Sequence, residues 1–349
     1  MSGRGSPARR SAGTEPGPPG TLVLRNDDLQ VTILPAKGAD IYALADRRTG
    51  VDVLFKSPWG IRSPGPWLRA ASSMERWVEA YPGGWQVLLP NGGDECVEQG
   101  VTWGYHGEAA LVPWTVTGTG DTWATLETRL FTVPLRIERE FTLDGPVLRL
   151  AETVTNESAA DLEVMWSHHP AFGAPFLDGG CLLSAGCRSV LADDEAPGTL
   201  LAPGSRHAWP HATPTAGDPL DLRRIPGPGE PRAVLAYLGD FTSGYFAITN
   251  PRLRLGVGLR WPLDTFGQAW LWQEVMSGEG WPWYQRAYAV AVEPAGTIPG
   301  HGMRGARARG QAGTRFAGGA ARQVVLEAVL FEGATAVAGI GEGGRVELA

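Results

Sequence analysis

The stretch LRIEREFTLDGPVLRLAETVTN, residues 135–156, decides the fold class. In its first half, apolar side chains alternate with charged ones, and only Arg139 breaks the pattern by falling among the apolar positions. The same period of two returns in residues 147–155. Successive side chains of a β-strand point to opposite faces of a sheet, so this alternation predicts strands that are buried on one face. We expect the charged face to meet solvent.

Short runs rich in β-branched and aromatic residues recur along most of the chain, bounded by Pro, Gly, Asp or Asn. They are residues 22–34, 52–55, 125–131, 233–237, 245–249, 253–261, 288–293 and 324–331. We find no convincing amphipathic helix of about ten residues or more. About fifteen or more strands without helices predict an all-β fold, a large antiparallel β-sandwich.

Composition divides the chain into a tail and one domain. Residues 1–20 are rich in Gly, Pro, Ser and Arg, and they are expected to form a disordered tail because they bury too little apolar surface. Residues 21–349 are expected to form a single β-sandwich domain. Within it, the Gly- and Arg-rich segment at about 300–319 is interpreted as a flexible loop. The alternative for this segment is a basic stretch that binds nucleic acid.

Charge and hydropathy exclude several classes of partner. The net charge of -7 and the pI near 5.5 argue against nucleic acid, because phosphate binding needs a basic face. No apolar run approaches the ~20 residues that span a bilayer, and the first residues do not resemble a signal peptide. The three cysteines form no CxxC pair and are expected to be buried thiols in a reducing compartment. These features predict a cytoplasmic protein.

Three residues that are far apart in the chain form a candidate general acid/base set: His106, His169 and Glu293. His169 belongs to the run WSHHPAFG, residues 166–173, and its neighbour His168 should point to the other face, into packing. In the run 288–293, Glu293 shares a face with two alanines, which leave room beside the carboxylate. Histidine and glutamate are common general acids and bases, so the three residues could perform proton transfer together.

Each of these residues also has a purely structural interpretation. Glu293 could face solvent at a strand end, and either histidine could be a core side chain held by a backbone carbonyl. The spacing of the histidines matches no metal-binding motif, so we expect no metal. His207 and His211 have HxxxH spacing, but Pro210 between them argues against the helix that would align them.

Four short motifs in a consistent order resemble those of the aldose 1-epimerase (galactose mutarotase-like) family. They are His106-Gly107 with Pro113-Trp114, ETVTN at 152–156, HPAF at 169–172 and Glu293-Pro294, and residues 266–272 are similar to the family's stretch before the last motif. The resemblance covers roughly Leu22 to Phe331. It implies a β-supersandwich fold, which agrees with the strands predicted above.

The chain departs from the better-known members of that family in three places, one of which is Glu108 after His106-Gly107, where many relatives differ. Their Arg- and Asn-containing segment, which grips sugar hydroxyls, is replaced by GGWQ at 83–86 and PNGGDE at 90–95. The motif Asn-His-Ser-Tyr-Phe of galactose-specific members is HHPAF at 168–172. These departures indicate an uncharacterised branch and leave the substrate open.

The resemblance implies a mutarotase that interconverts the α and β anomers of an aldose by acid/base ring opening. In that role Glu293 looks like the base, His169 the acid and His106 a hydrogen-bonding partner near the ring oxygen. The resemblance implies no cofactor, a small carbohydrate as ligand and a monomer or homodimer. The residues expected to contact the sugar are Asn91, Trp166, Phe172, Trp272 and Gln273, and Trp85 and Trp103 are further aromatic candidates nearby.

Two alternatives from other classes remain open. The first is a non-catalytic carbohydrate-binding or regulatory protein of sugar metabolism that kept the cleft. The second is an accessory domain of a sugar lyase or hydrolase, although such domains usually accompany a catalytic partner. Within the mutarotase class, sugar phosphates are a weaker possibility, with Arg69, Arg76 and Arg136 as candidate phosphate ligands.

Overall fold

The computed structural model describes residues 20–62, 72–196 and 198–349. Nearly all regular structure in this part is β, and only two α-helices of seven residues each occur, α1 (Ser73–Glu79) and α2 (Gly302–Ala308). A single 3₁₀ turn, η1, spans Glu342–Gly344. The helix content therefore lies well below the ~30–35% of average globular proteins. The all-β antiparallel sandwich predicted from the sequence is confirmed.

Two large antiparallel sheets carry the fold. The first follows the order β1 (Leu22–Arg25), β2 (Leu29–Leu34), β3 (Asp40–Asp46), β5 (Trp85–Leu88), β13 (Ser167–Gly173), β23 (Tyr288–Ala295), β22 (Gln268–Val275), β19 (Arg232–Gly239), β15 (Ser189–Ala192) and β16 (Arg206–Ala208), with β4 (Val51–Asp52) beside β3. The second follows the order β14 (Leu182–Ala185), β20 (Tyr245–Asn250), β21 (Leu255–Arg260), β25 (Ala321–Glu332), β11 (Val147–Asn156), β10 (Leu135–Asp144), β9 (Trp123–Arg129) and β8 (Thr115–Thr119).

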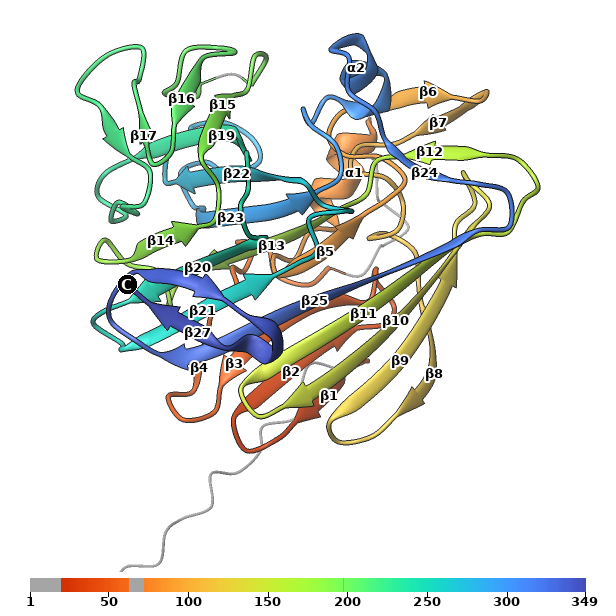
Figure 1. Ribbon diagram of the computed structural model, residues 1–349, viewed down its shortest axis with the longest axis horizontal. Coiled ribbons are helices and arrows are strands. Elements are labelled where there is room, and N and C mark those ends of the chain that lie inside the picture. Colours follow the sequence, from red (N-terminus) through yellow and green to blue (C-terminus); the bar gives the residue numbers. More distant parts are fainter. Residues whose placement is uncertain (1–19, 63–71, 197) are drawn as a thin grey trace, which may run out of the picture.

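Small two-stranded ribbons lie at the ends of the two large sheets. They are β6 (Cys96–Glu98) with β7 (Val101–Trp103), β12 (Leu162–Val164) with β24 (Thr314–Phe316), β17 (His211–Ala212) with β18 (Leu220–Asp221), and β26 (Val337–Ile340) with β27 (Val346–Leu348). Figure 1 shows β22, β23 and β13 above the long strands β25, β11 and β10 of the second sheet. One hydrophobic core joins the inner faces of both sheets.

Residues 135–156 form the hairpin of β10 and β11, and their alternation is reproduced in burial. The apolar positions of β10 are buried, whereas the intervening charged positions are exposed or half-buried. Arg139, the exception in the pattern, is buried with the apolar residues and pairs with Glu152 of β11 at 2.5 Å. A buried charge needs such a partner, because its desolvation is otherwise too costly.

Some local predictions need correction or cannot be compared. Residues 22–34, taken as one strand-like run, form a hairpin, because the side chain of Asn26 accepts hydrogen bonds from Asp28 and Leu29 and turns the chain. The segment 300–319, expected to be a flexible loop, contains α2 and β24. The predicted tail, residues 1–20, lies outside the described residues apart from Gly20.

The three cysteines are free and buried, as the sequence suggested. Burial raises the pKa of Cys181 and of Cys187 to about 12, so both remain protonated thiols at neutral pH. Within the described part of the chain, no helix has the length and apolar character needed to cross a membrane.

Candidate active site

A row of side chains crosses one face of the first sheet and carries the candidate chemistry. Glu293 of β23 lies opposite Trp270 of β22, which in turn lies opposite Tyr237 of β19. On the other side, His169 of β13 lies opposite Gln86 of β5 and within 3.6 Å of Glu293. Residues directly opposite one another in antiparallel strands share a face. The sheet register thus brings His169 and Glu293 together from positions far apart in the sequence.

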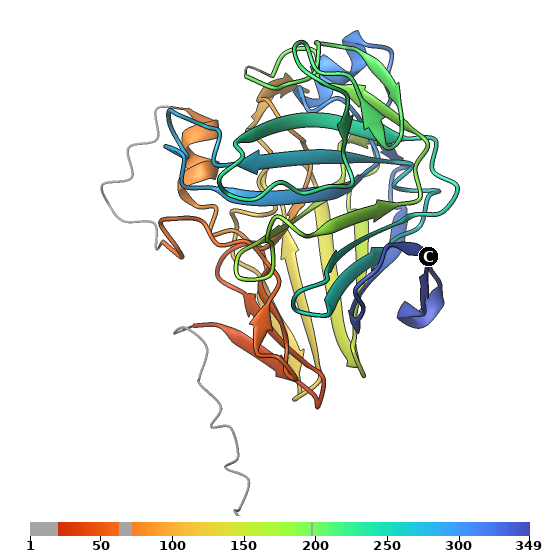
Figure 2. The same ribbon diagram turned by 90° about the vertical axis from the view of Figure 1, so that its left-hand side faces the viewer.

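Small side chains in the next row leave space beside the carboxylate. Ala171 of β13 lies opposite Ala291 of β23, and Ala291 lies opposite Trp272 of β22. These alanines belong to a buried cluster that includes Trp77 and Tyr81 from the helical segment. The turned view in Figure 2 shows α1 (orange) beside the blue strands of this sheet. Aromatic rings therefore cover the space beside the alanines.

A pocket of about 190 Å³ lies between the sheet and this aromatic cover. It is smaller than the ~300–1,000 Å³ typical of sites for drug-sized ligands, so it suits a small molecule. The described residues that line it are Met74, Trp77, Val78, Tyr81, Gly93, Tyr105, His106, His169, Leu235, Trp270, Trp272, Pro282, Trp283, Glu293 and Gly300. His106, His169 and Glu293, the predicted acid/base set, all lie in this lining.

Helix α1 forms one wall of the pocket and is explained by its sequence. The Ser72 hydroxyl accepts a hydrogen bond from the backbone of Glu75, whose carboxylate accepts one from the backbone of Ser72. This reciprocal capping box starts the helix and presents Trp77 and Val78 to the sheet. The Ser-x-x-Glu signature is visible in the sequence, but the helix is too short to show a periodic apolar pattern.

The ring orientation of His106 is set by its own backbone conformation and by a hydrogen bond from the backbone of Gly93. His106 has a positive φ of 56°, and its Nδ1 accepts a hydrogen bond of 2.9 Å from the backbone N–H of Gly93. The neutral imidazole must then carry its proton on Nε2, so Nε2–H is available as a donor. Burial, together with the nearby His169, holds the pKa of His106 well below its usual value. His106 is therefore a neutral hydrogen-bond donor at physiological pH.

His169 and Glu293 form a buried pair of titratable groups. The distance from His169 Nε2 to Glu293 Oε1 is 3.6 Å, and their side chains are only 8% and 2% exposed. Burial lowers the pKa of His169 to about 4 and raises the pKa of Glu293 well above its usual value. Because burial opposes the charged form of both groups, the pair favours states that together hold one proton.

Trp85, Trp166 and Phe172 were predicted near the site but lie in the core between the two sheets, beside His168. His168 accepts a hydrogen bond of 3.2 Å from Trp85 and lies 3.6 Å from Glu152, while Trp166 donates to Glu152 at 2.7 Å. Phe172 packs against Phe246 of the second sheet. His168 was expected to point into packing, and the structure places it there. Trp85, Trp166 and Phe172 do not line the pocket, because they share the face of β5 and β13 that meets the second sheet.

Two predicted sugar ligands, Gln273 and Asn91, also lie outside the lining. Gln273 follows Trp272 in β22 and therefore points to the opposite face, where it is fully buried. Asn91 donates to the carbonyls of Asp94 and Gly104, at 2.7 and 3.0 Å, and so ties together the two loops of the pocket rim. Trp103 is buried away from the pocket, and Trp272 is the predicted aromatic residue that lines it.

Aromatic residues supply much of the lining that sequence reasoning missed. Trp77 packs edge-on against His106, with 4.6 Å between ring centroids, and Tyr81 packs against His169 at 5.5 Å. Trp283 packs against Trp272 at 5.8 Å. Tyr105 directly precedes His106, and Trp270 lies two positions before the predicted Trp272 in the same strand, so the sequence offered a usable signal for these two. Trp77, Tyr81 and Trp283 carried no comparable signal, since only tertiary packing brings them to the pocket.

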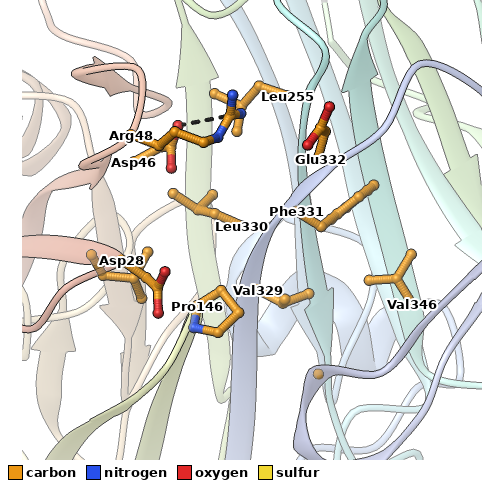
Figure 3. A pocket seen from close by; sticks show the side chains of 12 residues that line it. Asp28, Asp46, Arg48, Pro146, Leu255, Val329, Leu330, Phe331, Glu332 and Val346 are labelled. Carbon is orange, nitrogen blue, oxygen red and sulfur yellow. Dashed lines mark ion pairs between the residues drawn. The ribbon is translucent and has the colours of Figure 1, made fainter.

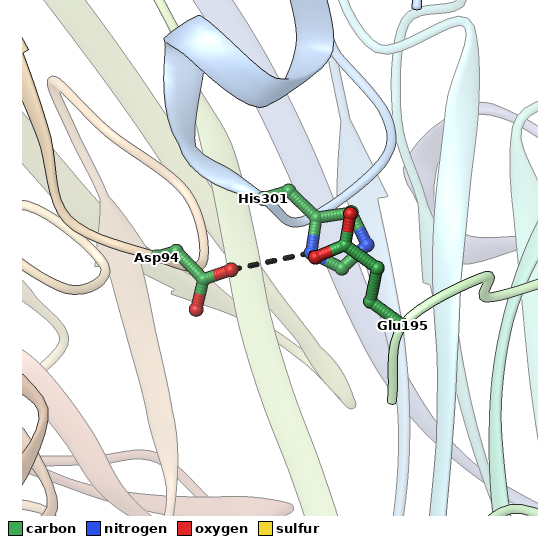
Figure 4. A group of neighbouring side chains, drawn as sticks. All are labelled: Asp94, Glu195 and His301. Carbon is green, nitrogen blue, oxygen red and sulfur yellow. Dashed lines mark hydrogen bonds and ion pairs between the residues drawn. The ribbon is translucent and has the colours of Figure 1, made fainter. Parts of the chain in front are cut away.

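A cluster of charges beside the pocket joins three loops around His301 (Figure 4). Its Nδ1 lies 3.2 Å from Asp94, and its Nε2 lies 3.0 Å from Asp193 and 3.2 Å from Asp194. Hydrogen bonds to Asp193 and Asp94 raise the pKa of His301 to about 10, so the ring is a cation at neutral pH. His301 therefore anchors the loops that carry Gly93 and Gly300 of the pocket rim.

The same cluster contains carboxylates and a histidine that lie close enough together to bind a metal ion. The spacing of the histidines in the sequence did not predict such a group. Asp94, Glu195 and His301 form one group of possible ligands, and Asp193 and Asp194 form a second group with His301. Arg309 pairs with Asp194 at 2.9 Å and also with Glu195. Two protein cations thus already meet this acidic charge, which favours the anchoring role over a metal centre.

Raising the pH should release this anchor. The pKa of His301 is raised above its unfolded value, so its stabilisation is fully present below about pH 6.5. It is lost as the pH rises through about 10. Thermal melts should show that His301→Gln lowers the melting temperature at neutral pH and that the difference from wild type shrinks above pH 10. A constant difference at every pH would show that the charge of His301 contributes nothing.

A second hollow of about 380 Å³ lies beside the C-terminal ribbon (Figure 3). Its floor is apolar, with Leu330 and Phe331, and its rim carries Asp46 paired with Arg48 at 3.6 Å. None of its described lining residues is a histidine, and none belongs to the predicted site. Although this hollow is larger and carries carboxylates at its rim, the histidines of the predicted acid/base set lie in the first pocket.

Comparison with models of known protein families finds one match for this chain. The family model DUF4432, described as a domain of unknown function, matches residues 20–327. The chain belongs to the DUF4432 family. Comparison with curated protein sequences finds no significant match for this DUF4432 chain.

Solved structures share the DUF4432 chain's fold at low sequence identity. The Slr1438 protein of Synechocystis sp. PCC 6803 is 16% identical with a TM-score of 0.64, covering 93% of this chain and 99% of that one. A galactose mutarotase-like protein from Lactobacillus casei ATCC 334 is 16% identical with a TM-score of 0.60, covering 89% and 100%. A galactose mutarotase related enzyme from Lactobacillus acidophilus is 15% identical with a TM-score of 0.61, covering 89% and 97%. The predicted resemblance to the mutarotase-like group, in an uncharacterised branch, is confirmed, and at these identities the likeness shows the fold.

Proposed function

We propose that this DUF4432 protein is a mutarotase that interconverts the α and β anomers of a free aldose. The observation that carries the proposal is the placement of His106, His169 and Glu293 in one small, aromatic-lined pocket. The fold shared with galactose mutarotase-like proteins supports the same reaction. Aromatic faces suit the apolar C–H face of a sugar ring.

The reaction moves one proton off the anomeric hydroxyl and one onto the ring oxygen. In the reactive state His169 holds the proton that the pair shares: the carboxylate of Glu293 accepts the proton of the O1 hydroxyl, and protonated His169 donates to the ring oxygen O5. The C1–O5 bond breaks, C1=O forms, the C1–C2 bond rotates, and the reverse transfers close the ring on the other face of the aldehyde. The proton count is unchanged over the cycle, and no oxidant or cofactor takes part.

The short separation of His169 and Glu293 suits this chemistry. The anomeric oxygen and the ring oxygen are bonded to the same carbon, so their proton-transfer partners need to lie side by side, as the 3.6 Å distance allows. A single proton shared by the pair leaves one base and one acid whichever residue holds it. His106 Nε2–H, held by the Gly93 contact at Nδ1, is oriented to donate to a sugar oxygen in either state.

The proposal is tested with anomerically pure aldoses. Polarimetry or NMR exchange spectroscopy should show that the wild-type protein accelerates anomer interconversion of at least one aldose above its spontaneous rate in the same buffer. Should the protein bind sugars, as measured by tryptophan fluorescence, and leave the rate spontaneous, the carbohydrate-binding or regulatory alternative replaces the mutarotase.

The pH profile of the enzyme should be a broad plateau. The working pair holds one proton, so the rate should fall on the acid side near pH 4, where His169 and Glu293 are both protonated. It should fall again at alkaline pH, where the pair loses its last proton at the raised pKa of Glu293. The measurement is kcat/KM against pH after subtraction of the spontaneous rate. An acid limb at the pKa of an ordinary histidine, roughly 6.5, would contradict a desolvated pair.

A further inference from the structure

Much of the pocket wall is apolar and cannot hydrogen-bond a sugar hydroxyl. Val78 and Met74 enter from α1, Leu235 enters from β19 beside Trp272, and Pro282 enters from the loop before β23. None of these four side chains has a polar hydrogen-bonding group. A hydroxyl placed against this wall gives up its water and finds no partner, which makes burial unfavourable.

The polar groups of the pocket are few and are divided between two tasks. His106, His169 and Glu293 serve the anomeric carbon in the proposed reaction. The Tyr81 hydroxyl and the Trp77 indole N–H are buried in the described structure without a hydrogen-bond partner. Such groups are costly unless a ligand or water satisfies them, so they are suited to ring hydroxyls. The Tyr105 hydroxyl and the indole N–H groups of Trp272 and Trp283 are further polar groups of the lining.

The charge of the pocket disfavours an anionic sugar. Among the lining residues that the structure describes, there is no lysine or arginine, and the carboxylate is that of Glu293. The Lys37 ammonium is paired with Asp40 at 2.5 Å, and Arg136 is paired with Glu138 at 3.0 Å. Arg76 lies on an exposed position of α1, and Arg69 lies outside the described residues. A phosphate or carboxylate would therefore meet no lysine or arginine side chain in this lining.

We infer that the substrate is an uncharged aldose with an apolar ring substituent, of the 6-deoxyhexose class, and that Val78 and Leu235 select it. This inference rests on the proposed function of the same pocket and adds its substrate class. A methyl group gains from contact with Val78 and Leu235, whereas the hydroxymethyl group of the parent hexose buries an unpaired hydroxyl. An apolar pocket discriminates against an added hydroxyl by about 10²-fold at most.

The test compares sugars that differ only in the hydroxyl at C6. The pairs are D-fucose with D-galactose and L-rhamnose with L-mannose, and D-glucuronate and D-glucose 6-phosphate serve as charged probes. In at least one pair the deoxy sugar should have the higher kcat/KM by roughly 10- to 100-fold. Dissociation constants from quenching of the pocket tryptophans should show the same preference. The charged probes should neither bind nor turn over.

Single substitutions test which side chains discriminate between the deoxy sugar and its parent hexose. Val78→Thr keeps the shape of the side chain, Leu235→Asn keeps roughly its size, and each adds a hydrogen-bonding group to the wall. Each should reduce the deoxy preference about tenfold, mainly by improving the parent hexose. Val116→Thr, the same change at an exposed position of β8, is the matched control and should leave the ratio unchanged. Cooperative thermal melts establish that each variant is folded.

The outcomes separate this inference from the proposed function. Accelerated mutarotation with equal or better use of the parent hexoses in both pairs overturns the inference and keeps the mutarotase. A deoxy preference in binding without any acceleration overturns the mutarotase and keeps the ligand class. Neither binding nor turnover for any neutral sugar, or tight binding of a charged probe, overturns the inference as well.

Discussion

Replacing Glu293 with glutamine should lower the mutarotation rate by roughly 10²–10⁴-fold, the usual contribution of general acid/base catalysis. Glutamine keeps the shape of the side chain and much of its hydrogen bonding, but it cannot accept the proton of the anomeric hydroxyl. The loss should therefore fall on kcat, with sugar binding by tryptophan fluorescence little changed. The measurement is NMR exchange of an accepted aldose with wild type and variant at matched concentration.

Stability separates loss of chemistry from loss of structure in this variant. Glu293 is 1% exposed, and burial raises the pKa of its carboxyl, so replacing it with a neutral amide should leave the melting temperature equal or higher. Glu274→Gln is a matched control, because Glu274 is also buried on β22 but accepts hydrogen bonds from Ser277 and Gly278 outside the pocket. An unchanged rate in Glu293→Gln, or an equal loss in Glu274→Gln, would contradict the assignment of Glu293 as the base.

The second large effect is expected at the buried ion pair behind the active site. Glu152→Gln should reduce the free energy of unfolding by about 3–5 kcal/mol, because it leaves Arg139 as an uncompensated charge between the sheets. Burial is the largest influence and opposes the charge of Glu152, but Arg139, His168 and the hydrogen bond from Trp166 together outweigh it, so the pKa of this carboxyl is lowered. The stabilisation is thus present above the unfolded pKa of Glu152 and is lost as the pH falls through its lowered folded value. Urea unfolding measures the difference.

Two further variants decide whether the unpaired charge is the cause. Arg139→Met combined with Glu152→Gln removes both charges and should recover most of the lost stability. Glu157→Gln breaks the exposed pair with Arg129, where the nitrogen–oxygen distance is 3.0 Å, and should cost only about 0–1 kcal/mol. A double variant as unstable as the single one would instead indicate that packing around residue 152 is responsible.

The ion pair of Arg139 and Glu152 also influences the active site, because Glu152 contacts residues near His169 in the chain. Glu152 accepts a hydrogen bond from Trp166 and lies near His168, which stand three residues and one residue before His169 in the chain. Because alternate residues of β13 face opposite sides, the contacts that hold His168 in the core also set the direction of His169. We therefore expect folded variants at Glu152 to lose mutarotation as well as stability.

The strands could be predicted from the sequence because the period of two is a property of the local backbone. Residues 135–156 show it most clearly, and even their exception, Arg139, marked a position that the structure fills with a buried ion pair. The same local rule placed Glu293 on a face with alanines, where the pocket lies. Sequence therefore determined the fold class, the face of the carboxylate and the order of the motifs.

The wrongly chosen neighbours of the site could have been excluded by the same rule. Trp166 and Phe172 lie at alternate positions of one run and share the face of His168, which cannot be the face of His169. Likewise Gln273 cannot share a face with Trp272, its immediate neighbour in β22. Residue type and proximity to a motif suggested these ligands, whereas parity along the strand decided against them.

Tertiary structure alone decided the properties that make the site reactive. The 3.6 Å contact of His169 with Glu293 depends on the register of β13 with β23, strands separated by more than a hundred residues. The aromatic cover comes from α1 and from the loop before β23, whose rings desolvate the pair and shift both pKa values. Desolvation and register depend on atoms brought together from distant segments, so no local pattern in the sequence encodes them.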